Sequence, residues 1–175
     1  MKKLVLLLSL WIGACAVAPP PGVTPVTGFE LDRYLGKWYE IARLDHAFER
    51  GLSNVSATYS LRADGGLQVL NRGYDDQARA WKDAEGRAYF IAEPTVGSLK
   101  VAFFGPFYGG YHVVALDKQD YAYVMISGPD RGYLWILARS RRLPPAMLDG
   151  LVQQAKALGF ATDRLIWVRQ DRDDA

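Results

Sequence analysis

The residue types that could do chemistry are scarce, and their spacing does not assemble a catalytic centre. The 175-residue chain contains two histidines, His46 and His112, and a single cysteine. Zinc sites need three or four His, Cys or carboxylate ligands, so two separated histidines do not predict one. No serine has small residues two positions away on both sides, as a nucleophile elbow requires. The sequence therefore predicts no catalytic residue, no metal site and no cofactor.

Glu40 is the carboxylate in the most informative position. The residues from Trp38 to Ala42 alternate as a strand does, which places Trp38, Glu40 and Ala42 on one face. If that face points into the protein, the carboxylate needs a hydrogen-bond partner or a raised pKa. Two interpretations stay open: Glu40 has a functional role, or it is satisfied by tyrosine hydroxyls or by Arg139.

The single cysteine ends an N-terminal leader. Two lysines and the apolar run 4–14 have the layout of a secretory signal, and the run is too short to span a bilayer. The run Ile-Gly-Ala-Cys that ends at Cys15 resembles the lipobox of bacterial lipoproteins. This resemblance implies that residues 1–14 are a signal peptide and that Cys15 is lipidated. Ala16 follows the cysteine in place of Asp, which by the same resemblance implies sorting to the outer membrane.

Composition and charge restrict the partners. Residues 15–28 contain four prolines and no apolar periodicity, so they are predicted to form an extended, lipidated tether. The two leader lysines account for the formal charge of +2, so the mature chain is nearly neutral. No basic tract stands out that could neutralise phosphates, which argues against a nucleic-acid partner.

Periodicity after the tether predicts an all-β domain. Segment 29–35 is expected to close one end of it, and eight strands are predicted at 38–42, 55–61, 67–74, 78–81 continuing into 87–92, 98–104, 111–116, 121–127 and 133–139. Turn residues at 63–66, 83–86 and 117–120 favour hairpins, and hence antiparallel neighbours. Eight strands with short links form an up-and-down barrel that can hold one small ligand.

Three further segments complete the domain. The long first loop, 44–52, is either a solvated turn or a lid with Phe48 pointing inward. An amphipathic helix at 144–158 is predicted to pack outside the barrel. A short strand at 165–168 is expected at an open seam, and residues 171–175 read as a polar tail.

Three motifs in this order resemble the signature regions of lipocalins. They are Gly36-Lys37-Trp38-Tyr39, the turn 128–133 that contains Asp130 and Tyr133, and Arg139 at the end of the last long strand. Together with Glu40-Ile41-Ala42-Arg43 and the 103–111 segment, they are similar to the bacterial outer-membrane lipocalins and, more distantly, to apolipoprotein D. The resemblance implies a barrel over residues 29–170, with Arg139 expected to stack on the Trp38 indole.

Strand parity gives a draft of the barrel interior. With Lys100 facing water, Leu99, Val101 and Phe103 should face inward. Trp135 is placed in the cavity because its face of the last long strand is the more aromatic one. Further interior candidates, each equally compatible with plain packing, are Tyr59, Phe90, Tyr108, Tyr111 and Phe48.

The function expected from the resemblance is binding of a single-chain lipid. Family members bind fatty acids, lysophospholipids and other small apolar molecules, which implies a carrier or store on the outer membrane, lipid-anchored and facing the periplasm, as a monomer or homodimer. One alternative is an enzyme on the same barrel, acting on lipid-like substrates. Another is a structural envelope protein whose lumen is filled by side chains.

Overall fold

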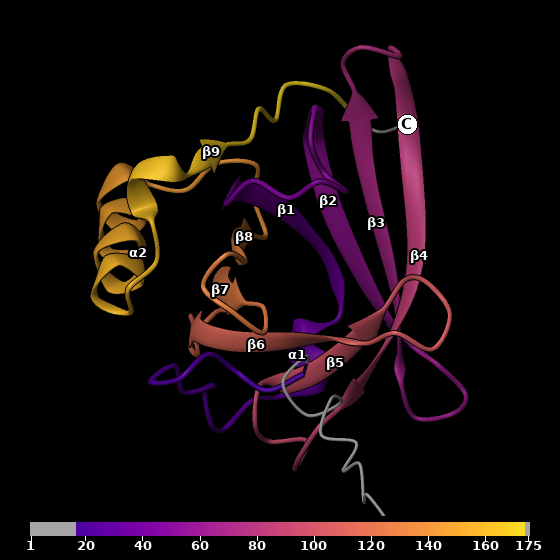
Figure 1. The fold of residues 1–175 in the computed structure, drawn as a ribbon, viewed down its shortest axis with the longest axis vertical. Coiled ribbons are helices and arrows are strands. Elements are labelled where there is room, and N and C mark those ends of the chain that lie inside the picture. The colour runs from indigo at the N-terminus through magenta and orange to yellow at the C-terminus, as the bar shows by residue number, and fades with distance from the viewer. Residues whose placement is uncertain (1–16, 174–175) are drawn as a thin grey trace, which may run out of the picture.

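The barrel is closed by eight antiparallel strands. The computed structural model describes residues 17–173, and in Figure 1 its strands curve around one axis. The strands are β1 (Gly36–Arg43), β2 (Leu52–Leu61), β3 (Leu67–Asp75), β4 (Ala80–Phe90), β5 (Ser98–Ala102), β6 (Gly109–Leu116), β7 (Tyr123–Ser127) and β8 (Leu134–Ala138). Neighbours in sequence pair from β2 to β8, β8 pairs with β1, and β1 pairs with β2 to close the barrel. The predicted fold class is confirmed.

A bulge in β1 divides the strand between two cores. The register of β1 against β8 shifts between Glu40 and Ala42. Trp38 consequently belongs to the core inside the barrel, whereas Ile41 and Ala42 belong to the core outside it. The prediction that Ala42 shares a face with Trp38 and Glu40 is wrong, because the extra residue of a bulge reverses the alternation beyond it.

The predicted turn at 83–86 is also wrong, because β4 runs through it without a break. The chain instead turns at 76–79, where Arg79 takes a positive φ. On the outer face Asp83 forms an ion pair with Arg72 of β3, with an N to O distance of 3.1 Å. Such cross-strand pairs keep polar residues in a strand that local sequence alone assigns to a turn.

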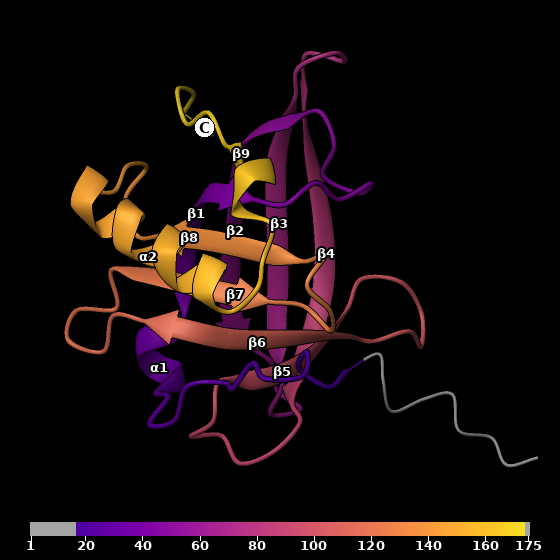
Figure 2. The ribbon, with the colours of Figure 1, turned by 60° about the vertical axis from the view of Figure 1, so that its left-hand side comes forward.

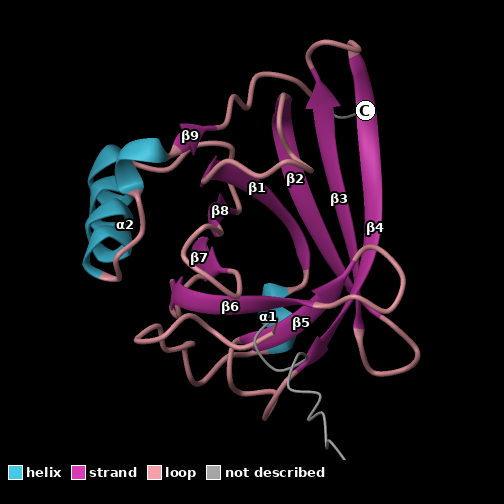
Figure 3. Ribbon diagram, in the orientation of Figure 1, coloured by secondary structure: helices cyan, strands magenta, loops and turns pink. Residues whose placement is uncertain are grey.

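The long helix α2 (Pro145–Ala157) packs outside the barrel, as predicted. Figure 2 shows it beside β7 and β8, and Figure 3 shows it as the one long helix among strands. Its Leu151 and Ala155 are buried against a core that includes Met125 and Ile136. The chain reverses after the helix at Gly159, whose φ of +84° suits glycine at a helix C-terminus.

The C-terminal segment fills the seam where β1 and β2 separate. After a short 3-10 helix (Thr162–Arg164), β9 (Ile166–Trp167) pairs with Ala42 and Arg43 of β1. The side-chain oxygen of Asn54 then accepts backbone N–H bonds from Asp171 and Arg172, at 2.7 Å each. Residues 171–172 of the predicted polar tail are therefore tied to the barrel.

The N-terminal segment also differs from the prediction. The Val26 backbone N–H donates to the Val113 carbonyl at 2.8 Å, and the Gly97 N–H donates to the Val26 carbonyl at 2.9 Å. Val23 is buried in the outer core. From residue 17 the proline-rich stretch thus lies along the barrel as an added edge partner and does not extend away as a tether. Cys15 and the leader lie outside the described residues.

The closed end is built around Trp38, as the motifs indicate. The short helix α1 (Leu31–Tyr34) lies beneath the barrel, and Gly36 follows with a φ of +90°. The Arg139 guanidinium carbon lies 3.9 Å from the centre of the Trp38 ring, which confirms the predicted stacking. The same guanidinium donates to the backbone carbonyls of Arg33, Leu35 and Lys37.

Arg139→Ala should lower the free energy of unfolding by about 2 to 3 kcal/mol, because it removes a cation–π contact and three charge-assisted hydrogen bonds. The test is urea denaturation with an unchanged m-value. Arg139→Lys keeps the charge over the indole and serves as the control, with an intermediate loss. An unchanged midpoint in Arg139→Ala would contradict this account of the closed end.

Candidate functional site

The barrel encloses a cavity of about 650 Å³ that opens at the end opposite α1. This volume lies within the range of small-molecule sites. The alternative of a structural envelope protein, whose lumen would be filled by side chains, is therefore wrong. The lining is mainly aliphatic and aromatic, with residues from all eight strands or their mouth loops, including Val55, Leu67, Val69, Ala88, Leu99, Val101, Ile126 and Leu137.

Seven of the nine interior candidates line the cavity: Leu99, Val101, Phe103, Tyr59, Tyr111, Trp135 and Phe48. Two do not. Phe90 packs beneath the cavity against Phe29, with ring centres 6.1 Å apart. Tyr108 lies on the outer side, where its hydroxyl accepts a hydrogen bond from Arg87 at 3.1 Å. Its expected inward position is wrong because β5 ends at Ala102 and the following bend breaks the alternation.

The floor of the cavity carries three tyrosine hydroxyls. Tyr111 hydrogen-bonds both Tyr34 and, at 2.8 Å, Tyr59. Burial raises the pKa of Tyr59 to about 12, so the hydroxyls stay protonated. Trp38 lies below this layer, with its ring centre 5.0 Å from that of Tyr34. A ligand that enters from the mouth thus meets the tyrosines before it could reach the indole.

A buried charge cluster lies in the wall near the mouth. Glu40 accepts a hydrogen bond from the Arg43 guanidinium at 2.6 Å, and both side chains are almost fully buried. Glu49, from the first loop, is 4.0 Å from the same guanidinium and accepts a hydrogen bond from the Trp135 indole at 3.0 Å. Glu40 is therefore satisfied by Arg43, and not by the tyrosine hydroxyls or Arg139 that one of the two interpretations named.

Two carboxyl groups share one guanidinium in this cluster. Burial, followed by repulsion from Glu49, raises the pKa of Glu40 from an ordinary value near 4.5 to about 8, against the opposing effect of Arg43. Burial also raises the pKa of Glu49. Because both carboxyl groups line the cavity, they form a polar band that favours hydrogen-bond donors over a ligand carboxylate.

The first loop is latched over the mouth and is not a solvated turn. Arg43 donates to the backbone carbonyls of Glu49 and Leu52, at 2.9 and 3.2 Å. The buried His46 ring stacks on Tyr133 and Phe48, with ring centres 4.8 and 5.4 Å apart. Phe48 lines the cavity rim but is still 60% exposed, so it lies across the opening without pointing deep inside.

Sequence reasoning did not predict the buried contacts of Arg43, Glu49 and His46. Arg43 is buried because the β1 bulge turns it toward Glu40. Glu49 lies in a loop without periodicity. The only available signal was the mixture of charges and aromatic residues in 45–51.

The middle signature turn positions the mouth through its backbone. The Asp130 side chain accepts a hydrogen bond from the Gly132 N–H at 2.7 Å, and the Tyr133 N–H donates to the Asp130 carbonyl. This turn points Tyr133 toward His46 and the cavity. Asp130 and Tyr133 thus connect the turn to the loop that covers the mouth.

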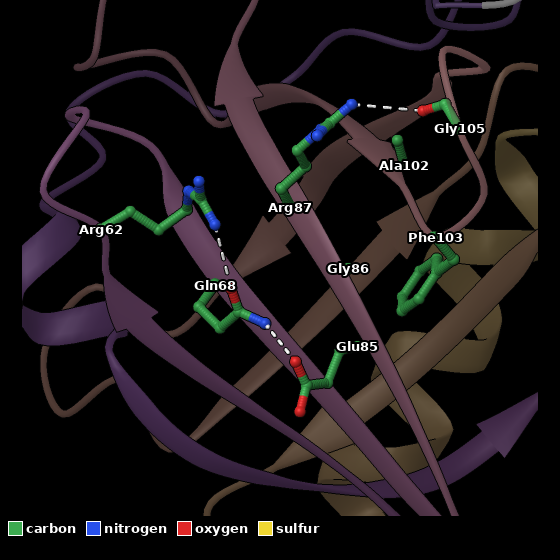
Figure 4. A pocket seen from close by; sticks show the side chains of 8 residues that line it. All are labelled: Arg62, Gln68, Glu85, Gly86, Arg87, Ala102, Phe103 and Gly105. Carbon is green, nitrogen blue, oxygen red and sulfur yellow. Dashed lines mark hydrogen bonds between the residues drawn. The ribbon is translucent and has the colours of Figure 1, made fainter.

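A second, smaller depression of about 240 Å³ lies on the outer face of β3, β4 and β5. Figure 4 shows Arg62, Gln68 and Glu85 joined in a row by hydrogen bonds of 3.1 and 3.2 Å. These side chains satisfy one another on an open surface. The depression is therefore a weaker candidate than the cavity.

The described part of the chain contains neither a group of metal-binding side chains nor a membrane-spanning helix. Within residues 17–173 no three His, Cys, Asp or Glu side chains group closely enough to hold a metal ion. In the same range no helix is long and apolar enough to cross a membrane. His112, which hydrogen-bonds Ser98 at 3.0 Å, is a buried sheet histidine.

The charge cluster predicts how stability depends on pH. The folded state keeps a proton on Glu40 that the unfolded chain releases, so Glu40 makes stability fall as pH rises from about 4.5 to about 8. Burial and the nearby Arg43 lower the pKa of His46 from 6.5 to about 4. His46 therefore makes stability rise as the pH rises from about 4 to 6.5. Above pH 6.5 only the carboxyl effect remains.

We therefore expect the free energy of unfolding to fall by about 1 to 2 kcal/mol between pH 6.5 and 8. Glu40→Gln removes the titrating group and should flatten this slope. Urea titrations of both proteins across the interval provide the measurement. A wild-type slope of zero, or an equally steep slope in Glu40→Gln, would contradict a raised pKa at Glu40.

Comparisons with known proteins agree with this geometry. The family model of the lipocalin-like domain matches residues 29–170. The outer membrane lipoprotein Blc of Vibrio cholerae is 52% identical over 171 residues, which cover 97% of this chain and 99% of the relative. Blc of Escherichia coli K12 is 51% identical over 92% of this chain and 90% of the relative. Bovine apolipoprotein D is 34% identical over 77% of this chain and 70% of the relative.

A solved structure shows the same fold at lower identity. Insecticyanin from the tobacco hornworm superposes with a TM-score of 0.70 at 22% identity, over 90% of this chain and 88% of that one. At this identity the likeness concerns the fold alone. The Blc relatives, matched over nearly their full lengths, place the chain among lipid-anchored lipoproteins of the outer membrane. By its family match, its barrel and its signature residues, the chain belongs to the lipocalin-like family.

Proposed function

We propose that the chain binds one single-chain lipid, a fatty acid or a lysophospholipid, in the barrel cavity and carries or stores it in the cell envelope. The observation that supports this most directly is the cavity itself, which is about 650 Å³ in volume, apolar along its walls and open at one end. An acyl chain is the kind of ligand that gains most from such walls, because each buried methylene contributes about 0.8 kcal/mol.

The polar groups favour a tail-first orientation. Leu99, Val101 and Leu137 offer apolar contacts between the mouth and the tyrosine floor. Glu40 and Glu49 lie in the wall near the mouth, where a hydroxyl or ammonium group of the lipid can donate to them. A free carboxylate is disfavoured beside these two groups, so it remains at the rim in contact with water.

The test of the proposal is a titration of the chain with fatty acids and lysophospholipids of increasing length, followed by tryptophan fluorescence or calorimetry. Affinity should rise roughly three- to fourfold per methylene and then reach a plateau when the tail meets Tyr34, Tyr59 and Tyr111. An affinity independent of chain length would contradict tail-first binding. Mass spectrometry of lipids that co-purify with the protein would identify the natural ligand.

We also propose that Cys15 carries the lipid anchor and that the barrel faces the periplasm. The lipobox-like end of the leader supports the assignment, and so do the relatives named outer membrane lipoproteins. Cys15→Ser should leave the protein unlipidated and displace it from the outer-membrane fraction. Fractionation of the variant with the outer membrane, as for the wild type, would rule Cys15 out as the anchor.

A further inference from the structure

We propose that the rim of the barrel mouth docks on a lipid surface through Phe48, Phe104 and Phe107, so that the cavity opens onto the membrane that holds the anchor. The proposed lipidation of Cys15 identifies which membrane the rim would meet, and the inference depends on the proposed function in that respect alone. The docking surface is carried by the rim itself.

The three phenylalanines form an exposed apolar rim. Phe48 is 60% exposed, Phe104 78% and Phe107 80%, and all three line the opening of the cavity. Phe48 belongs to the loop between β1 and β2, and the other two belong to the loop between β5 and β6. These hairpins are four strands apart in an eight-stranded barrel, so they stand on opposite sides of the mouth. Exposed apolar side chains therefore border the opening on two opposite sides.

The chain leaves the described region at the same rim. The Val17 carbonyl oxygen lies beside Gly110, at 3.0 Å from where a side-chain carbon on that glycine would stand. Gly110 is at the mouth end of β6, immediately after the loop with Phe104 and Phe107. The Pro21 carbonyl accepts a hydrogen bond of 2.7 Å from Arg131 in the mouth loop between β7 and β8. Cys15, the proposed site of the anchor, precedes Val17 by two residues in the sequence.

The surroundings of the β5–β6 loop suit a lipid surface. Behind the exposed phenylalanines, Arg87 donates to the Gly105 carbonyl at 3.2 Å and to the Tyr108 hydroxyl. The Lys100 ammonium lies 5.0 Å from the centre of the Tyr108 ring. Aromatic tips with cations one layer behind them match the boundary between acyl chains and head groups.

A second copy of the chain is the less suitable occupant. A stable interface buries about 800 Å² on each partner, and three phenylalanine side chains supply about half of that area. A bilayer needs no complementary shape, and it contains the molecules that the cavity is proposed to take. Docking by the rim would allow a lipid to pass between the leaflet and the cavity without crossing water.

The experiment uses the chain from Ala16 to Ala175, since every strand, both cores and α2 lie within residues 17–173. Sedimentation with vesicles of phosphatidylethanolamine and phosphatidylglycerol should show binding of the parent chain in both low-salt and high-salt buffer. The variant Phe104→Ser with Phe107→Ser should partition at least tenfold more weakly. Leu61→Ser and Ile91→Ser are matched controls, because these residues are 57% and 42% exposed at the closed end of the barrel, and they should bind as the parent does.

A tryptophan placed in the rim tests docking on vesicles through a gain of fluorescence quenching, without removing an apolar side chain. Phe107→Trp should be quenched by brominated phospholipids in the vesicles beyond the level of the parent, whereas Leu61→Trp should not. Three results would overturn the inference. The first is equal partitioning of the parent and the double variant, and the second is equal weakening of vesicle binding in the control variants. The third is a double variant that binds vesicles as the parent does but has lost a dimer that the parent forms in sedimentation velocity. Titration of the parent with a fatty acid in vesicle-free buffer reports the proposed function separately, so failure of one is distinguishable from failure of the other.

Discussion

Val101→Lys should lower the affinity for a single-chain lipid at least a hundredfold. Val101 lies in the cavity wall between the mouth and the floor, and it is only half-buried because it borders the cavity. A lysine there would place an ammonium group against the acyl chain, and ligand binding would then strip water from that charge. A hundredfold loss corresponds to about 2.7 kcal/mol, well below the full cost of burying an unpaired charge.

The fold should survive this change, because the cavity can hydrate the ammonium when no ligand is bound. Circular dichroism and urea denaturation establish that the variant is folded, and fluorescence titration with a long-chain fatty acid measures its affinity. Lys100→Ala is the control from the outward face of the same strand, and it should bind as the wild type does. A folded Val101→Lys protein with unchanged affinity would show that the tail does not run along β5.

Above pH 8, where Glu40 is ionised, Arg43→Leu should destabilise the protein by about 3 to 5 kcal/mol, the cost of breaking a buried ion pair from one side. The substitution leaves Glu40 and Glu49 buried beside each other without a cation, and it removes the hydrogen bonds that hold the first loop through the carbonyls of Glu49 and Leu52. The measurement is the urea midpoint at constant m-value.

The defect should shrink as pH falls, since protonation removes the uncompensated negative charge. Arg43→Leu combined with Glu40→Gln should recover part of the lost stability for the same reason. Arg50→Leu is the control from the adjacent loop, because the pair between Arg50 and Asp45 is exposed and its loss should hardly move the midpoint. If Arg43→Leu were no worse than Arg50→Leu, the cluster would not be the latch of the first loop.

The barrel, its closed end and most of its walls were predictable from local sequence. Strand alternation depends on side chains two residues apart, so it placed Leu99, Val101 and Phe103 inside without knowledge of their partners. The Trp38 and Arg139 contact was predictable because the signature motifs carry it. Helix α2 was predictable because its apolar spacing is local and the prolines before it and Gly159 after it mark its ends.

The positions where that alternation fails depend on contacts between distant parts of the chain. The bulge after Glu40 turned Ala42 outward and buried Arg43, and a bulge follows from pairing with β8 and β9, which lie far away in sequence. The bend after Ala102 moved Tyr108 outside for a similar reason. The pairing of Glu49 with Arg43 joins a loop to a strand, and no periodicity links the two.

The positions of the two ends of the described chain were also not predictable from local sequence. Residues 17–28 are rich in proline and lack a pattern, yet they lie along the barrel because Gly97 and Val113 offer free backbone groups at an edge. Residues 171–172 are polar, yet they are held at the barrel. The irregular pairing of β2 around Asn54 leaves the side-chain oxygen of that residue available to accept their backbone N–H groups. Local sequence specifies which elements form, whereas the backbone groups that those elements leave unpaired decide where an irregular segment binds.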